Sequence, residues 1–157
     1  ILKYIIGSKI KRVYAETAQR IHSAHEDLLI GTIKFENGVL GVINANWLTP
    51  KKVREITITG ERGMFTANYL TQEIYFYENE FTRNNAGYGR RFMNVIEGKL
   101  RKISVKKGEP LKNELSAFSE AILKDKKPLV SGKDGLDALY IAQKFIDSSK
   151  QNKVITL

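Results

Sequence analysis

The stretch from Asn46 to Phe65 reads Asn-Trp-Leu-Thr-Pro-Lys-Lys-Val-Arg-Glu-Ile-Thr-Ile-Thr-Gly-Glu-Arg-Gly-Met-Phe. It holds the single tryptophan, one of three prolines, and a Lys-Lys-x-Arg cluster that leads into a regular strand pattern. From Val53 to Thr59 the residues alternate with the period of two that a β-strand has, and residues 60–63 supply a turn with two glycines. The stretch predicts a strand-to-strand loop that presents polar and cationic groups on a rigid sheet.

Further strands are predicted on both sides of this stretch. Ile10 to Thr17 is a first strand, and Leu29 to Phe35 pairs with Val39 to Trp47 through Glu36-Asn37-Gly38, a sequence typical of a tight hairpin turn. After the two-glycine turn, residues 64–69 and 72–77 continue an antiparallel meander.

The segment from Glu78 to Gly98 is rich in Asn, Gly and Arg and alternates only weakly. We interpret it as a long loop that grades into a strand including Leu100 to Val105. A loop of this length either covers a site or is mobile.

Helices are predicted near both ends of the chain. Ile1 to Gly7 looks like the last turns of a helix closed by glycine, and the missing cap at residue 1 suggests a fragment or the continuation of an upstream domain. From Pro110 the period becomes about 3.6 residues. The stripe of this helix consists of Leu111, Leu115, Phe118 and Ile122.

A second long helix runs from about Asp134 to Ser149, with Ser131 or Asp134 as its cap. Its inward residues are predicted to be Leu136, Leu139, Ala142, Phe145 and Ile146. Lys153 to Leu157 adds a last short strand.

These elements predict a single α+β domain over residues 1–157, with an open, mainly antiparallel sheet of about six strands and helices packed on one face. The other face is too apolar to be solvated, so it is predicted to form a subunit interface. A clean monomer in light scattering at micromolar concentration would contradict this. The apolar residues concerned are Leu40, Val42, Ile56, Ile58, Phe65, Tyr75 and Tyr77.

Composition narrows the functional classes. The chain has no cysteine and two histidines, which argues against disulfides and against a Cys- or His-rich metal site. It lacks a signal-peptide pattern and an apolar run of membrane-spanning length, so a cytoplasmic location is expected. The net charge of +9 would suit an anionic partner, but the lysines are spread along the chain without interleaved aromatics, which argues against nucleic acid.

No dinucleotide fingerprint, phosphate loop, nucleophile elbow or zinc-protease motif is present in the sequence. His25-Glu26-Asp27 joins a base and two carboxylates, but neighbours in an extended segment point to alternating faces. We therefore favour a role in capping or entering a strand over catalysis.

The stronger candidate for a binding site is the loop at the centre of the opening stretch. It offers an aromatic plane, amide and hydroxyl groups, and cations for a phosphate or carboxylate. A tryptophan anchoring the sheet edge beside solvated lysines explains the same residues equally well. These residues are Asn46, Trp47, Thr49, Lys51, Lys52 and Arg54.

The order of these motifs resembles the C-terminal domain of the Gfo/Idh/MocA oxidoreductases over essentially the whole chain. The matching motifs are the helix end at Gly7, His25-Glu26-Asp27, Phe35-x-Asn37-Gly38, Asn46-Trp47-x-x-Pro50-x-x-x-Arg54, Gly60-x-x-Gly63, Glu109-Pro110-Leu111 with Glu114-Leu115-x-x-Phe118, and Ser131-Gly132-x-Asp134-Gly135-Leu136.

The resemblance implies a two-domain enzyme that moves hydride between a sugar hydroxyl carbon and NAD or NADP. The nucleotide would be bound mainly by an N-terminal Rossmann domain that lies outside this chain. The family's catalytic Lys, Asp and His would also lie upstream, so no catalytic residue and no metal ligand is assigned here, and the isolated chain is expected to be inactive. The family's open sheet implies a homodimer or homotetramer.

Within the family, the Asn46 loop and the string Asn68-Tyr69-Leu70-Thr71-Gln72 resemble the branch that oxidises the 3-hydroxyl of UDP-N-acetylglucosamine or a related nucleotide sugar. Asn68 departs from the aspartate that is commoner in that branch. The alternative function is a non-catalytic basic binding or assembly module that engages nucleic acid. The substrate-binding residues implied are Asn46, Trp47, Thr49, Lys52, Arg54, Tyr69 and Gln72.

Overall fold

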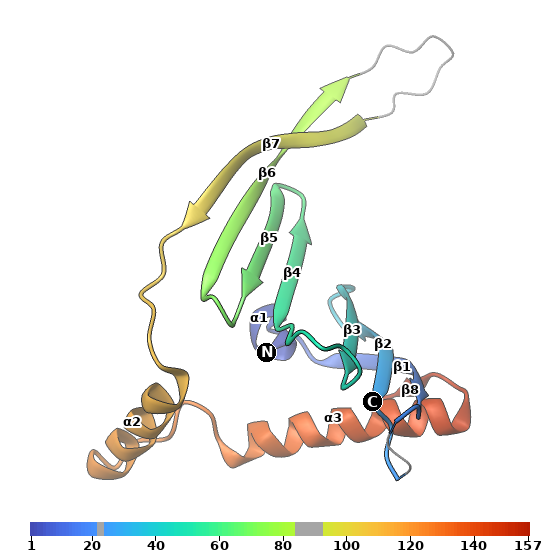
Figure 1. Ribbon diagram of the computed structural model, residues 1–157, viewed down its shortest axis with the longest axis vertical. Coiled ribbons are helices and arrows are strands. Elements are labelled where there is room, and N and C mark those ends of the chain that lie inside the picture. The colour runs from blue at the N-terminus through green and yellow to red at the C-terminus, as the bar shows by residue number, and fades with distance from the viewer. Residues whose placement is uncertain (22–23, 84–92) are drawn as a thin grey trace. The chain divides into compact units, whose positions relative to one another are not determined.

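The computed structural model describes residues 1–21, 24–83 and 93–157 and confirms an α+β fold with antiparallel sheets (Figure 1). The described residues form eight strands in two sheets of four, rather than about six strands in one sheet. The chain divides into two compact units, residues 1–50 with 115–157 and residues 51–114. Each unit is described by itself.

The first unit is built on a sheet with strand order β3-β2-β1-β8. Its strands are β1 (Ile10–Ala18), β2 (Leu28–Phe35), β3 (Leu40–Asn46) and β8 (Ile155–Thr156). The predicted hairpin between β2 and β3 is confirmed. Its turn is closed by hydrogen bonds from Phe35 N–H to the Val39 carbonyl at 2.9 Å and from Gly38 N–H to the Phe35 carbonyl at 3.1 Å. Gly38, with φ of 89°, takes the left-handed conformation that this turn requires.

Two helices, α1 (Leu2–Ile6) and α3 (Gly132–Gln151), pack on one face of this sheet. The core consists of Val13, Ala15, Ile33, Phe35 and Phe145. As predicted, α1 ends at a glycine in the left-handed conformation, since Gly7 has φ of 64° and donates to the Lys3 carbonyl. The packing of α3 on one face of a sheet was also predicted.

The buried face of α3 differs from the predicted one. Phe145 is buried as expected, but Leu136 and Leu139 are 66% and 71% exposed. Ile141, Phe145 and the polar Ser148 turn toward the sheet instead. Helix α3 has apolar residues on two sides. In its first half the sequence pattern predicted burial of the side with Leu136 and Leu139, which is exposed.

Ser148 is fully buried, and its burial is tolerated because the hydroxyl both donates and accepts a hydrogen bond. It donates to the Lys153 carbonyl at 2.6 Å and accepts from the Ala15 amide at 3.2 Å. The neighbouring Ser149 hydroxyl accepts from the Thr17 amide at 3.0 Å. Beyond the short strand β8, these two serines bind the edge of β1, whose unpaired amides would otherwise be open to another chain.

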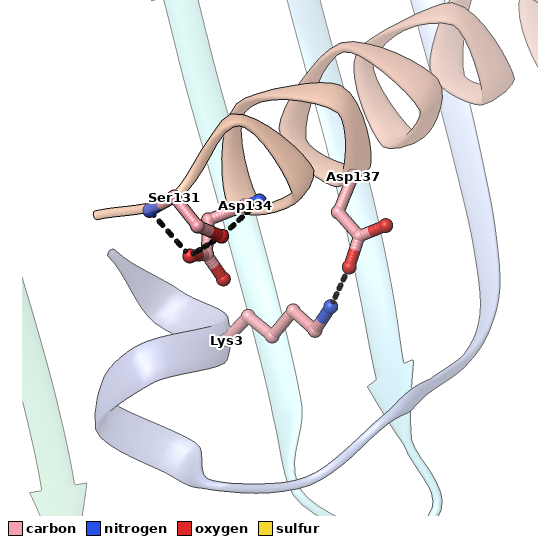
Figure 2. A network of polar contacts seen from close by, with 4 residues as sticks. All are labelled: Lys3, Ser131, Asp134 and Asp137. Atoms are coloured by element: carbon pink, nitrogen blue, oxygen red, sulfur yellow. Dashed lines mark hydrogen bonds and ion pairs between the residues drawn. The ribbon is translucent and has the colours of Figure 1, made fainter. Parts of the chain in front are cut away.

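The start of α3 is fixed by Ser131, one of the two predicted caps. Its hydroxyl accepts from the Asp134 amide at 3.3 Å, while the Asp134 carboxylate accepts from the Ser131 amide at 2.8 Å, which completes a capping box. One turn further, Asp137 binds Lys3 of α1 at 2.5 Å (Figure 2). This part of α1 is therefore tied to the first turns of α3.

The hydrogen bonds from Ser131, with help from Lys3 and Lys133, hold the pKa of Asp134 below its ordinary value of 3.8. In the unfolded chain this carboxyl takes up its proton at higher pH than in the folded chain, so its stabilising effect is lost as the pH falls below about 4. We expect the thermal midpoint to drop between pH 5 and pH 3 less steeply in Asp134→Asn than in the wild type. An equally steep drop in that variant would contradict the assignment, and Ser131→Ala should also flatten the profile.

The second unit is a four-stranded antiparallel sheet with strands in sequence order. It consists of β4 (Glu55–Gly60), β5 (Gly63–Asn68), β6 (Glu73–Arg83) and β7 (Met93–Ile103). One row of paired residues runs Ile58, Phe65, Phe76 and Arg101, and the rings of Phe65 and Phe76 lie 4.5 Å apart between centroids. Tyr75 and Tyr77 lie on the opposite face from this row, because successive side chains of a strand alternate. The apolar residues predicted for a subunit interface thus occupy more than one face.

The interpretation of residues 78–98 as a long loop is wrong for most of the described part. Residues 78–83 extend β6 and residues 93–98 belong to β7, while residues 84–92 lie outside the described residues. The pairing shifts between Tyr77 and Asn79, where one residue of β6, Glu78, faces two of β7, Gly98 and Lys99. Such a bulge interrupts the alternation that identifies a strand in a sequence.

Helix α2 (Pro110–Leu123) starts at the predicted proline. The Glu109 carboxylate accepts from the Lys112 amide at 2.6 Å and so caps the first turn of the helix. The α2 stripe, defined as Leu111, Leu115, Phe118 and Ile122, is exposed rather than packed on a sheet.

Candidate functional site

The loop after β3 is shaped by Asn46. The side-chain carbonyl of Asn46 accepts from the Leu48 amide at 3.1 Å, the Thr49 amide at 3.0 Å and the Thr49 hydroxyl at 3.1 Å. The structure thus brings together two of the predicted binding residues, Asn46 and Thr49. The Asn46 oxygen is engaged in turning the chain, which leaves its amide nitrogen available for a ligand.

Trp47 stands next to this turn. Its amide donates to the Asp27 carbonyl at 2.9 Å, while its side chain is 81% exposed. Within the first unit the ring is therefore not a sheet anchor, which is the alternative that the sequence left open. An exposed indole beside a rigid turn can stack on a planar or sugar ring.

The second loop lies after β5 in the other unit and has the same design. The Asn68 oxygen accepts from the Leu70 and Thr71 amides, both at 2.9 Å, and its amide nitrogen donates to Glu55 at 2.8 Å. The Tyr69 amide donates to the Arg54 carbonyl at 2.9 Å, so Arg54 and Tyr69 are neighbours. Lys52 and Arg54 are both exposed.

Gln72 has a structural role in the same unit. Its side-chain amide donates to the Gly108 carbonyl at 2.6 Å and accepts from the Gly108 amide at 2.9 Å. This pair of bonds fixes the segment that leads into α2. The remaining hydrogen-bonding capacity of Gln72 for a substrate is small, so of the seven candidates it has the weakest case on geometry.

The segment of His25-Glu26-Asp27 is organised by its aspartate. Asp27 is 1% exposed, and its Oδ2 accepts from the Arg20 amide at 2.9 Å and the Ile21 amide at 2.6 Å. Glu26 Oε1 lies 3.8 Å from Lys150 Nζ. These contacts fit the favoured role at the start of a strand, since the buried carboxylate closes the loop before β2. His22 lies outside the described residues.

The seven predicted binding residues are divided between the two units. Asn46, Trp47 and Thr49 belong to the first, and Lys52, Arg54, Tyr69 and Gln72 to the second. Each unit brings some of its members together through backbone turns.

Sequence reasoning missed a charged cluster on β6 and β7. Lys102 binds Glu73 at 2.6 Å and lies 5.5 Å from the centre of the Tyr75 ring. The hydrogen bond and charge of Lys102 lower the pKa of Glu73, and Glu73 followed by Tyr75 raises the pKa of Lys102. Both groups therefore stay charged at neutral pH. The cluster could have been found only from the strand register, because its residues are far apart in the sequence.

A groove of about 680 Å³ opens on the apolar row of the second sheet. Its floor is formed by Ile58, Phe65 and Phe76, and Arg101 binds Glu78 at its rim at 3.0 Å. None of the seven predicted residues lines this groove. Across the described part of the chain, no group of three or more metal-ligating side chains is found. Nor does that part contain a helix long and apolar enough to cross a membrane.

Comparison with known families confirms the resemblance. Residues 1–66 match the family described as the GFO/IDH/MocA C-terminal domain. This match includes the loop of Asn46, Trp47 and Thr49 and the two-glycine turn. A comparison with functionally curated proteins finds no match.

Solved structures share the fold over nearly the whole chain. The aldose-aldose oxidoreductase from Caulobacter crescentus is 16% identical with a TM-score of 0.75, covering 99% of this chain and 44% of its own. The WlbA dehydrogenase from Bordetella pertussis, in complex with NADH and UDP-GlcNAcA, is 22% identical with a TM-score of 0.67, covering 99% and 41%. The UDP-N-acetylglucosamine 3-dehydrogenase GnnA from Acidithiobacillus ferrooxidans is 16% identical with a TM-score of 0.67, covering 90% and 41%. At these identities the likeness establishes the fold, and this chain spans less than half the length of each protein.

Proposed function

We propose that this chain is the C-terminal, substrate-binding and assembly domain of an NAD(P)-dependent oxidoreductase acting on a sugar or nucleotide-sugar hydroxyl. The observation that carries the proposal is the shared fold over 90–99% of the chain with three oxidoreductases, together with the family match over residues 1–66. Two of the three are dehydrogenases named with UDP-sugars. The 3-hydroxyl of a UDP-N-acetylhexosamine is the substrate position that we favour.

The described residues do not themselves form a dinucleotide site. Such sites lie at the carboxyl ends of parallel strands beside a glycine-rich turn, whereas both sheets here are antiparallel. NAD or NADP would therefore be bound by a separate domain, which would also carry the catalytic residues for hydride transfer. The residues of this chain would bind and orient the sugar nucleotide, and the open sheet faces would carry a homodimer or homotetramer contact.

The binding role rests on chemistry at the two loops. Trp47 offers an exposed ring for stacking, and Asn46 offers an amide nitrogen held in place by the turn. Lys52 and Arg54 supply exposed positive charge of the kind that binds a diphosphate.

The proposal is tested on the complete gene product. We expect NAD- or NADP-dependent oxidation of a UDP-N-acetylhexosamine, and no turnover by the 157-residue chain. Turnover by the chain alone would contradict the division of roles. Salt-dependent retention on DNA, with no dinucleotide fingerprint upstream of residue 1, would favour the alternative binding module.

Arg54→Ala in the complete enzyme is expected to raise the KM for the sugar nucleotide about tenfold and to leave kcat within about twofold. The reason is that a lost contact to a diphosphate weakens ground-state and transition-state binding alike. Initial rates at saturating NAD(P) measure the effect. Lys127→Ala, which removes an exposed charge beyond α2, is the matched control, and an unchanged KM in Arg54→Ala would show that Arg54 only packs.

A further inference from the structure

The turn between β5 and β6 is fixed at its first residue by Asn68 and at its last by Gln72. The Asn68 oxygen accepts from the Leu70 and Thr71 amides, both at 2.9 Å. At the other end, the Gln72 side chain donates to the Gly108 carbonyl at 2.6 Å and accepts from the Gly108 amide at 2.9 Å. Two opposed residues of an antiparallel ladder exchange hydrogen bonds in the same way. The shape of this turn is therefore determined by the protein's own groups.

The backbone of Gln72 has an unusual conformation. Its φ of 54° lies in the left-handed region, which residues other than glycine seldom adopt. In the described part of the chain, the other non-glycine residues with positive φ are Asp125 and Asn152, which follow the ends of helices, where this conformation is common. Strained backbone conformations persist only where surrounding contacts determine them, and they are concentrated at functional sites. The two bonds to Gly108 are contacts of this kind.

Gly108 is itself anchored. The next residue, Glu109, accepts from the Lys112 amide at 2.6 Å and so caps the first turn of a helix. These residues and Gln72 belong to the same unit of residues 51–114. Gln72 therefore ties the β5–β6 turn to a fixed point of its own unit.

The exposed ring in this turn belongs to Tyr69, three residues before Gln72. Its side chain is 41% exposed, and its amide donates to the Arg54 carbonyl at 2.9 Å. A tyrosine ring can pack on a planar or sugar ring while its hydroxyl forms a hydrogen bond. The Gln72 nitrogen and oxygen, by contrast, are both engaged with Gly108, which leaves little capacity for a ligand.

Resting on the proposed function, we propose that Gln72 is a positioning residue for the sugar nucleotide. By binding Gly108 it holds the β5–β6 turn so that the Tyr69 ring is in place to pack on a ring of the substrate. Gln72 then acts on binding through Tyr69, whereas the family resemblance implies direct contact with the substrate. A ring that is held in place beforehand loses less conformational freedom when the substrate binds.

A double-mutant cycle in the complete gene product tests this proposal. We expect Tyr69→Ala to raise the KM for a UDP-N-acetylhexosamine about tenfold and Gln72→Ala about fivefold, with kcat within about twofold in both. Because Gln72 acts through Tyr69, the double variant should stay about tenfold above the wild type, no higher than Tyr69→Ala alone. Gln151→Ala, which removes an exposed glutamine at the end of α3, is the control and should leave the KM unchanged. A double variant near the product of the two effects, about fiftyfold, would mean that Gln72 contacts the substrate itself.

Hydrogen exchange at the Gly108 amide measures the two bonds directly. In the substrate-free complete gene product, this amide should exchange about tenfold or more faster in Gln72→Ala than in the wild type. If Gln72→Ala does not fold, Gln72→Glu keeps the acceptor for the Gly108 amide and loses only the bond to the carbonyl. It should raise the KM about twofold or more, and only while Tyr69 is present.

The remaining outcomes separate this proposal from the proposed function. Unchanged exchange at Gly108, or an unchanged KM in Gln72→Ala, would overturn the positioning role. An enzyme that oxidises a UDP-N-acetylhexosamine while the two substitutions act independently loses only that role. A gene product that does not bind the sugar nucleotide removes the proposed function, and the positioning role with it.

Discussion

Gly63→Ala is expected to destabilise the unit of residues 51–114 by roughly 2 to 6 kcal/mol, because overpacking and backbone strain each contribute about 1 to 3 kcal/mol. A Cβ at this position would lie 2.2 Å from the Tyr77 carbonyl oxygen and 2.6 Å from the Phe76 ring. The oxygen belongs to the backbone of a paired strand and cannot move aside without breaking the ladder. The φ of 155° adds strain for any residue with a side chain.

Gly60 is the matched control, since it faces Gly63 across the same turn. A Cβ there would meet only the Gly63 carbonyl oxygen at 3.9 Å, so Gly60→Ala should cost less than about 1 kcal/mol. Urea denaturation followed by tyrosine fluorescence measures both variants. Similar midpoints for the two would show that the β4–β5 turn relaxes freely and that the close approach of Gly63 to β6 is not required.

The elements that sequence reasoning predicted well are those specified by neighbouring residues. Gly38 decides the β2–β3 turn, Pro110 begins α2, and Ser131 caps α3 through a partner three residues away. Each signal depends on a few consecutive residues, so it can be recognised in the sequence without knowledge of the tertiary structure.

The elements that were missed depend on contacts between distant segments. The bulge at Gly98 breaks the alternation of β7, so the extension of the β6–β7 pair was interpreted as a loop. An isolated glycine in a weakly alternating segment is the signal that could have indicated it. The position of Ser148 on the core face of α3 was missed because its burial depends on the amide of Ala15, which is 133 residues away in the sequence.

The sequence predicted which loops form the candidate site. It did not predict which side chains in those loops are available to a ligand. Asn46 and Gln72 are polar residues in turns, and sequence alone could not tell whether their side chains serve the backbone or a ligand. The structure shows that the Asn46 oxygen and both ends of the Gln72 amide serve the backbone. The exposure of Trp47, by contrast, favours the binding role over the anchoring role.

Phe145→Ala is expected to destabilise the unit of residues 1–50 and 115–157 by about 3 to 5 kcal/mol, the usual cost of removing a buried ring. Phe145 is 3% exposed and is the residue through which α3 contributes to the core. The ring lies directly over Gly31, where an added Cβ would sit 2.6 Å from its Cε1 atom. Thermal or urea unfolding followed by circular dichroism would measure the loss.

A second substitution at Gly31 tests whether the Phe145 ring packs on this glycine, in addition to its effect on stability. Gly31→Ala by itself should cost about 1 to 3 kcal/mol by overpacking against the ring. In the double variant with Phe145→Ala, the new methyl group enters the vacated space, so the loss should fall short of the sum by about 1 kcal/mol or more. Gly41→Ala is the control, because its Cβ would have no neighbour nearer than 3.7 Å and should add to Phe145→Ala without coupling. If the losses of Gly31→Ala and Phe145→Ala were strictly additive, the Phe145 ring of α3 would not pack on Gly31 of β2. The packing of α3 on this face of the sheet would then be wrong.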